Sequence, residues 1–160
     1  MPGGFGIAEL INDAAVTDFL AAQGASARFV TSVCTGALLL GAAGLLDGYQ
    51  AATHWAYMEC LPPFGATPVA KRVVIDRNRI TAGGVTSGID FGLQVVAEVG
   101  GETLAKSLQL GLEYDPAPPF HCGHPDVADP AILAAVRQRY QKPLQAQQEQ
   151  IERWRARRSG

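Results

Sequence analysis

The sequence predicts an α/β domain in which helices cover both faces of a mainly parallel sheet. Segments rich in β-branched residues alternate along the chain with segments rich in helix formers, and this order is typical of layered α/β folds. Of the 160 residues, 48% are hydrophobic and 18% are charged, so the chain can bury a core and is not disordered. The 18 glycines and 10 prolines are spread along the sequence and mark turns.

The first half of the chain predicts helices and strands separated by short turns. The expected elements are a turn at Met1–Gly4, a helix over Ile7–Gln23, a strand over Arg28–Val33, a helix over Ala37–Leu46, a short strand over Ala51–Trp55 and a short helix over Ala56–Leu61. Gly and Pro mark the turn, β-branched residues mark the first strand, and Ala and Leu mark the helix after it. Gly44 and Gly48 offer places to end that helix, and Pro62 stops the short one.

The second half predicts a hairpin followed by helices. The expected elements are strands over Arg72–Ile75 and Arg79–Ala82, a helix that opens in Gly83–Gly88, a helix over Glu102–Glu113, a rigid loop over Asp115–Phe120 and a helix from Asp129-Pro130 through Tyr140. Polar residues between the two strands form the hairpin turn. Thr86 or Ser87 is placed to cap the next helix, and Ile89 and Leu93 begin its apolar face. Asp is a good helix cap, and Pro suits the first helical turn.

Charge and cysteine content exclude several classes of protein. The chain has 13 Lys and Arg against 15 Asp and Glu, so we expect neither nucleic acid nor an anionic membrane as its main partner. Its longest apolar run, Ala37–Leu46, is shorter than the roughly 20 residues of a membrane span. No basic residue precedes Arg28, so we expect no secretory signal. Three cysteines without a CxxC pair favour a reducing, cytoplasmic setting.

Cys34 is the strongest candidate for a reactive residue. It lies between a predicted buried strand and the start of a helix, where an open α/β sheet presents its ligands. Exposed amides and the helix dipole stabilise negative charge on a sulfur placed there. Small neighbours such as Gly36 permit the sharp turn of a nucleophile elbow. The alternative is a buried structural cysteine.

His54 and the Gly83-Gly84 pair are the next candidates. His54 ends a predicted strand and is placed either to stabilise a Cys34 thiolate or to hydrogen-bond the backbone. The glycine pair lacks the Lys of a Walker motif and a third Gly at dinucleotide spacing, so it favours nucleotide binding only weakly. We expect instead that it brings its loop close to the sulfur.

Other candidate residues favour structural roles. Cys122 lies between His121 and His124, but three ligands in a Pro-bounded loop seldom form a metal site without a fourth, so a solvated loop is favoured. Cys60 is expected in the core. Trp154 lies among arginines in a polar segment, and it predicts a solvated terminal helix whose aromatic ring docks on the body or on a partner subunit.

Several blocks of the sequence resemble one family. The blocks VTSVCTGALLLGAAGLLDG, AATHW, ITAGGVTSGIDFGLQVVAE and LGLEYDPAPPF occur in this order. Together they resemble the ThiJ/PfpI superfamily (class I glutamine amidotransferase-like), and within it the bacterial isocyanide hydratases. The resemblance covers most of the chain and predicts a ThiJ/PfpI-like domain over residues 1–125 and a helical extension over residues 126–160.

The resemblance implies a flavodoxin-like three-layer sandwich, a homodimer, a small-molecule substrate and no metal or organic cofactor. It also implies that Cys34 attacks the terminal carbon of an isocyanide and that water converts the thioimidate to an N-substituted formamide. The amides of Thr35 and Gly4 are implied to face the reacting group. The Thr35 hydroxyl and the loop Gly83-Gly84-Val85-Thr86 are implied to line the pocket.

Two departures from the family pattern affect these expectations. Protease-like members carry His directly after the nucleophile, and Thr35 in its place disfavours peptide hydrolysis. Family members also have a segment before the PGG turn that holds the first strands of the sheet and an acidic partner of the cysteine. We therefore expect those strands and that acid to lie outside this sequence, upstream of Met1.

Two alternative functions accompany this prediction. One is another activity of the same scaffold, either on glyoxals and glycated thiols or as a stress protein whose cysteine is oxidised. The other is the sensor domain of an AraC-like regulator. The residues after Phe120 show no helix-turn-helix pattern, which disfavours the regulator.

Overall fold

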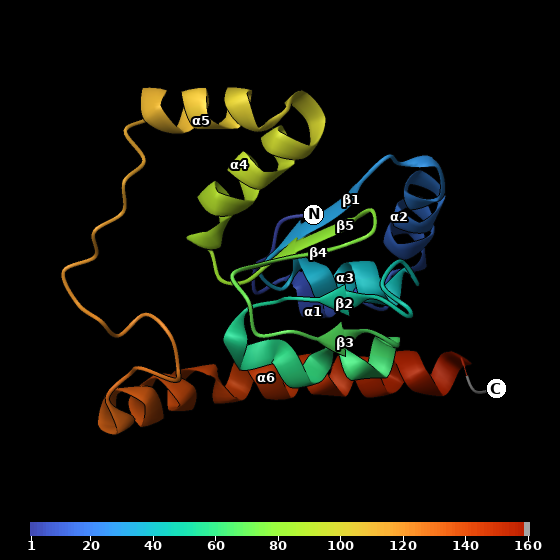
Figure 1. The fold of residues 1–160 in the computed structure, drawn as a ribbon. Helices are drawn as coiled ribbons and strands as arrows, with labels where there is room; N and C mark the ends of the chain where they lie inside the picture. Colours follow the sequence, from blue (N-terminus) through green and yellow to red (C-terminus); the bar gives the residue numbers. More distant parts are fainter. Residues whose placement is uncertain (159–160) are drawn as a thin grey trace.

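A computed structural model describes residues 1–158, and the helices and strands are shown in Figure 1. In order, they are α1 (Ile7–Leu10), α2 (Ala14–Ser26), β1 (Val30–Val33), α3 (Gly36–Ala42), β2 (Gln50–Ala51), the 3₁₀ helices η1 (Trp55–Cys60) and η2 (Pro62–Phe64), β3 (Thr67–Pro68), β4 (Val73–Asp76), β5 (Arg79–Ala82), α4 (Ser87–Gly100), α5 (Glu102–Gly111) and α6 (Pro130–Arg158). This alternation confirms the predicted α/β class.

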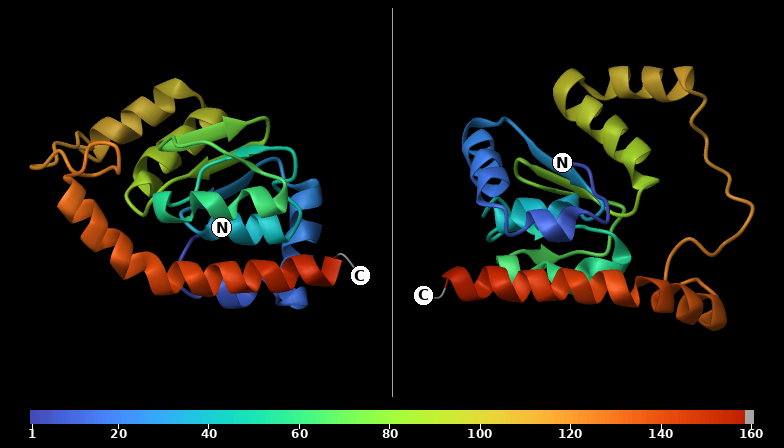
Figure 2. Two further views of the ribbon diagram at one scale, coloured as in Figure 1. Left: turned by 90° about the horizontal axis from the view of Figure 1, so that it is seen from below. Right: turned by 180° about the vertical axis from the view of Figure 1, so that it is seen from behind.

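The strands form a mixed three-stranded sheet and a separate two-stranded pair. In the larger sheet, β1 pairs in parallel with β5, and β5 pairs antiparallel with β4 as the predicted hairpin. The smaller pair, β2 with β3, is parallel. Figures 1 and 2 show α3 on one side of the larger sheet and α4 on the other. The three-layer sandwich and the additional strands upstream stay predictions.

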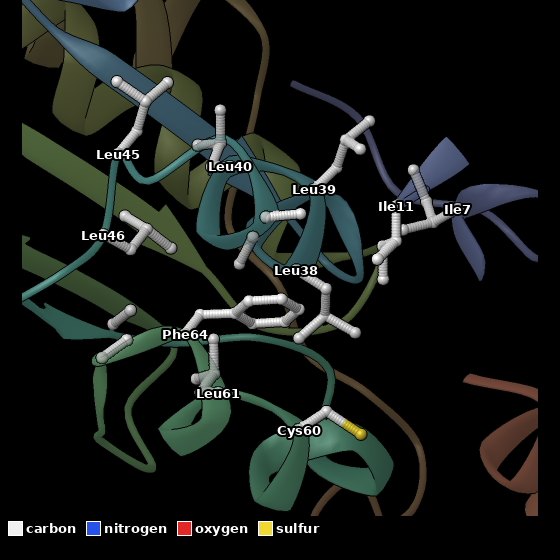
Figure 3. Packing of buried hydrophobic residues seen from close by; sticks show 14 of the residues in the cluster. Ile7, Ile11, Leu38, Leu39, Leu40, Leu45, Leu46, Cys60, Leu61 and Phe64 are labelled. Carbon is white, nitrogen blue, oxygen red and sulfur yellow. The ribbon is translucent and has the colours of Figure 1, made fainter. Parts of the chain in front are cut away.

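The core lies between the sheet, α3 and the two 3₁₀ helices. Every residue of α3 is buried, and Leu38 points toward Phe64 within the hydrophobic core (Figure 3). Full burial of a leucine side chain contributes about 1.5–3 kcal/mol to stability. Cys60 is 1% exposed, which confirms its expected place in the core. Burial raises the pKa of its thiol to about 11.

The boundaries of two predicted helices and the side-chain cap of a third differ from the prediction. The stretch Ile7–Gln23 forms two helices, because the Asp13 carboxylate accepts hydrogen bonds from the Ala15 and Val16 amides and starts a new helix. The helix predicted to reach Leu46 ends at Ala42, just before Gly44 takes a φ of +76°. The hydroxyls of Thr86 and Ser87 do not cap α4; Ser87 Oγ donates to the Gly84 carbonyl.

Residues 51–61 also differ from their prediction. The strand expected over Ala51–Trp55 is only the two residues of β2, and the short helix that follows is the 3₁₀ helix η1. The short helix ends at Cys60, before Pro62, as predicted, and a separate 3₁₀ helix, η2, begins at Pro62. Proline suits a helix start, where its missing N–H would have no partner.

The C-terminal helix α6 runs along one side of the molecule (Figure 2). Its start is confirmed, because Asp129 Oδ1 accepts from the Ala131 amide at 2.8 Å, but it continues past Tyr140 to Arg158. The predicted docking of Trp154 on the body is confirmed: its ring lies 4.7 Å from that of Phe64, and its indole N–H donates to the Ala42 carbonyl at 3.1 Å. The boundary at residue 125 stays a prediction.

Within residues 1–158, no helix has both the length and the apolar character needed to cross a membrane.

Candidate active site

Cys34 occupies a sharp turn between β1 and α3. Its φ is +59°, a left-handed conformation that costs a residue with a side chain about 1–3 kcal/mol. The turn is held by its backbone: the Cys34 amide donates to the carbonyls of Ala82 (3.0 Å) and Gly83 (2.8 Å), and its carbonyl accepts from Thr53 Oγ1 at 2.9 Å. The side chain is half-buried. This arrangement presents the sulfur at the end of a buried strand.

The Gly3-Gly4 segment lies directly against this turn. The Thr35 hydroxyl accepts from the Gly4 amide at 2.9 Å and donates to the Gly4 carbonyl at 3.0 Å. The Gly4 amide therefore points at Thr35 Oγ1, which differs from the expectation that it faces the reacting group. A Cβ on Gly3 would lie 2.7 Å from both Cys34 Cβ and the Thr35 nitrogen. A side chain at this position would press on the Thr35 amide, so glycine is required here.

The predicted role of Gly36 as a small neighbour agrees with its packing. A Cβ there would lie 2.5 Å from the Met1 carbonyl oxygen and 2.7 Å from that of Pro2. The backbone of Met1-Pro2 therefore crosses the first turn of α3 at a distance that no larger residue permits.

A cavity of about 280 Å³ opens beside Cys34. The PGG turn and the cysteine turn form one wall, and aromatic residues form the other. The lining residues are Pro2, Gly3, Gly4, Phe5, Val33, Cys34, Thr35, His54, Tyr57, Val85 and Tyr140. None of these residues, all within the described part of the chain, carries a carboxylate. The cavity therefore suits an uncharged, largely apolar group.

His54 lies in this wall but contacts the backbone and a tyrosine. Its Nδ1 accepts from the Ala56 amide at 3.2 Å and its Nε2 lies 3.4 Å from the Tyr140 hydroxyl. Burial lowers the pKa of His54 below its usual 6.5, which favours the neutral imidazole at pH 7. Of its two expected roles, the geometry supports hydrogen bonding to the backbone.

The glycine loop borders a second, larger cavity of about 500 Å³. Gly83, Gly84 and Thr86 line this one and not the cavity beside the sulfur, whereas His54 and Val85 line both. Gly83 still approaches Cys34 through the backbone hydrogen bond described above. A Cβ on Gly84 would lie 3.3 Å from His54 Cδ2. Thr86 is instead held by Arg72, which donates to its carbonyl at 2.9 Å.

Tyr57 and Tyr140 are cavity residues that the sequence analysis missed. Tyr57 lies in η1, close in sequence to His54. This closeness is a signal that places it near the same site. Burial raises the pKa of Tyr57, and the neighbouring Tyr140 and Cys34 add to the effect. Tyr140 lies on α6 and reaches the cavity only through tertiary packing, so no local pattern indicates its place.

The His121–His124 segment does not line the cavity beside Cys34, but His124 lines the second cavity. His121 and His124 are exposed and Cys122 is half-buried, and His124 Nδ1 lies 3.3 Å from an Asp126 carboxylate oxygen. Within residues 1–158, no three His, Cys, Asp or Glu side chains are grouped so as to hold a metal ion.

The strand–turn–helix geometry at Cys34 is that of the nucleophile elbow, by which α/β enzymes present a reactive side chain. The DJ-1/PfpI family model matches residues 1–98. The chain belongs to the DJ-1/PfpI family.

The proteins similar to this chain carry the names of different functions. An isonitrile hydratase from Pseudomonas putida is 51% identical over 153 residues, which cover 96% of this chain and 67% of that protein. The HTH-type transcriptional regulator GbdR from Pseudomonas aeruginosa is 38% identical over 118 residues, covering 71% of this chain and 31% of the regulator. A crystal structure of a ThiJ/PfpI family protein from Pseudomonas syringae matches with a TM-score of 0.88 and 44% identity, covering 91% of this chain. The chain spans 60% of the length of that structure.

Proposed function

We propose that this protein hydrates an isocyanide to an N-substituted formamide through Cys34. The observation that carries the proposal is the 51% identity, across 96% of the chain, to a protein named isonitrile hydratase. The site supports it, because the sulfur lies on a strained turn at the edge of a cavity lined by apolar and aromatic groups. An isocyanide R–N≡C presents a reactive carbon and an apolar R group to such a site.

The proposed reaction has two stages. In the first, the Cys34 sulfur forms a bond to the terminal carbon, and that carbon takes up a proton to give a thioimidate, R–N=CH–S. In the second, water adds to the same carbon and one of its protons passes to the nitrogen. The carbon–sulfur bond then breaks as the hydroxyl loses its proton to form the carbonyl, and this proton replaces the one taken up in the first stage. The thiolate is regenerated, and the net change is the addition of one water to give R–NH–CHO.

Each residue around the sulfur has its own role in the proposed reaction. The Thr35 amide donates a hydrogen bond to the charge that develops during attack. The Thr35 hydroxyl and Gly4 hold each other and so fix the PGG turn beside the sulfur. Gly36 lets the Met1-Pro2 backbone approach the turn, and Val85 and His54 line the cavity.

We also propose a homodimer that acts in the cytoplasm. The support is the family resemblance for the dimer and, for the location, three cysteines that are all free. Unpaired cysteines are typical of a reducing compartment.

The proposal is tested by following N-(4-nitrophenyl)formamide formation from 4-nitrophenyl isocyanide. Wild-type protein should form the formamide, and Cys34→Ser should not, because a hydroxyl is a far weaker nucleophile than a thiolate. Formamide production by Cys34→Ser would refute the role of the sulfur. A folded wild-type protein that leaves the isocyanide unchanged would refute the activity, and methylglyoxal is the next substrate, for the glyoxalase-like alternative.

The regulator is a second candidate function, favoured by the 38% identity to GbdR over 118 residues. In that case Cys34 is not needed for chemistry and the cavity binds an effector. Salt-dependent DNA binding by the purified protein, together with no isocyanide turnover, would favour this alternative.

A further inference from the structure

Tyr140 carries an aromatic ring from the C-terminal helix into the wall of the Cys34 cavity. Its ring centroid lies 4.9 Å from that of His54, 5.7 Å from Trp55 and 6.1 Å from Tyr57. The planes of Tyr140 and Tyr57 are inclined by 88°, and those of Tyr140 and Trp55 by 67°. Such edge-to-face pairs are favoured by the charge distribution of aromatic rings. The Tyr140 ring is therefore held by rings of η1 and the residue before it.

The position of Tyr140 is also determined by how α6 docks. Further along the helix, Trp154 binds the Ala42 carbonyl and packs on Phe64. Asn12 Nδ2 donates to the Gln150 carbonyl at 2.9 Å. These contacts fix α6 to α3, η2 and the segment after α1, so the tyrosine is a permanent part of the cavity wall.

The hydrogen bonds of His54 determine the direction of the Tyr140 hydroxyl. Because Nδ1 accepts from the Ala56 amide, the proton of the neutral imidazole lies on Nε2. Nε2 faces the Tyr140 oxygen at 3.4 Å, so the imidazole donates and the tyrosine accepts. His54 is thus a positioning residue for Tyr140, which lines the cavity beside Cys34.

We propose that Tyr140 is a specificity-determining residue that selects substrates with a planar aryl group next to the carbon attacked by Cys34. The inference rests on the proposed function. Tyr140 lines the cavity that also holds Cys34, so an aryl group seated there can contact its aromatic ring. A cyclohexyl group occupies a similar volume but lacks the charge distribution that makes these contacts favourable.

Ligand binding tests this selection without any need for turnover. N-phenylformamide and N-cyclohexylformamide are titrated by calorimetry into Cys34→Ser and into Cys34→Ser combined with Tyr140→Leu. We expect the preference for the phenyl ligand, given as the ratio of the two Kd values, to fall about fivefold when the ring is removed. Tyr140→Phe in the same background keeps the ring and should keep the preference.

A matched control is Arg139→Leu, an exposed neighbour on the same helix, which should leave the ratio unchanged. Tyr140→Met is a second ringless variant, whose flexible side chain fills the space of the lost ring if Tyr140→Leu does not fold. In turnover, loss of the ring should raise KM for the aryl isocyanide and leave kcat unchanged, because the contact is equal in the ground and transition states.

The outcomes separate the inference from the proposed function. If the wild-type protein forms formamide but the ringless variants keep the phenyl preference, the inference is overturned and the hydration stands. If the preference depends on Tyr140 but no isocyanide is consumed, aryl selection stands and the hydration is refuted. If neither formamide binds, the inference is overturned.

Discussion

Cys34 combines a strained backbone with neighbours that enforce the strain. A non-glycine residue at φ +59° persists only where the surroundings hold it, and here the two acceptors of its amide and the Thr53 hydroxyl do so. Gly3 also packs closely against this turn. The geometry of the sulfur therefore depends on residues that have no reactive group of their own.

Gly3→Ala tests this dependence. The added Cβ would lie 2.7 Å from Cys34 Cβ and from the Thr35 nitrogen, so the turn must shift and the Thr35 amide is covered. We expect kcat/KM for an isocyanide to fall roughly tenfold to 100-fold, since small displacements of reacting groups are costly. Gly6→Ala is the control, because its Cβ meets nothing within 4 Å. Equal activity of the two variants would contradict the argument.

Burial of His54 should make the folded protein less stable at acidic pH. Burial lowers its pKa in the folded protein below 6.5, so the unfolded chain binds the proton more readily. Stability is then complete above about 6.5 and is lost as the pH falls through the interval between the two pKa values. We expect the urea midpoint of the wild type to fall more between pH 7.5 and 5.5 than that of His54→Asn, whose amide oxygen can still accept from Ala56. Parallel changes in the two proteins would exclude His54 as the cause.

At the scale of elements, the docking of α6 on the body is a separate source of stability. Trp154 supplies both an edge-to-face contact with Phe64 and a hydrogen bond to Ala42. Because α6 also carries Tyr140, the same contacts that stabilise the fold place a wall of the cavity.

Two substitutions of Trp154 should measure separately what the hydrogen bond and the ring contact contribute to stability. Trp154→Phe loses the hydrogen bond and should lower the free energy of unfolding by about 1 kcal/mol. Trp154→Ala loses the ring as well and should lower it by about 2 kcal/mol, less than for a fully buried tryptophan. Urea unfolding followed by circular dichroism measures both, with the exposed Arg153→Ala as control. A Trp154→Ala variant as stable as the wild type would show that the helix does not depend on this contact.

Elements with strong local signals were predicted well from sequence. The unit β1–Cys34–α3, the hairpin of β4 and β5 and the start of α6 each have β-branched runs, turn residues or a capping residue. Strand β3 was missed and β2 was predicted with the wrong bounds, because two-residue strands such as Thr67–Pro68 have no periodicity. Tyr140 was missed because its place in the site arises from helix docking. Local sequence patterns therefore predicted the cysteine turn, but not the tyrosines that line the cavity beside it.

At the scale of the whole molecule, α4 and α5 extend away from the sheet (Figure 1). They expose a series of large apolar side chains. These are Val85 just before α4, Ile89, Val99, Leu104, Leu108, Leu110 and, after α5, Leu112. Leu104, Leu108 and Leu112 recur at the spacing of one helix face, and exposed apolar side chains gathered on one face often mark an interface with another protein. A second copy of the chain is the partner that the proposed homodimer supplies for this surface.

The mass in solution tests that assignment. Light scattering on the eluted protein should give about twice 16.9 kDa. Leu104→Lys combined with Leu108→Lys should shift the mass toward one chain, because burying two charged ammonium groups in an apolar interface is unfavourable. Phe19→Lys is the matched control, since Phe19 is 61% exposed on α2, remote from α5. A dimer that survives the leucine substitutions but not the Phe19 change would place the interface on α2, and a wild-type mass of one chain would refute the dimer.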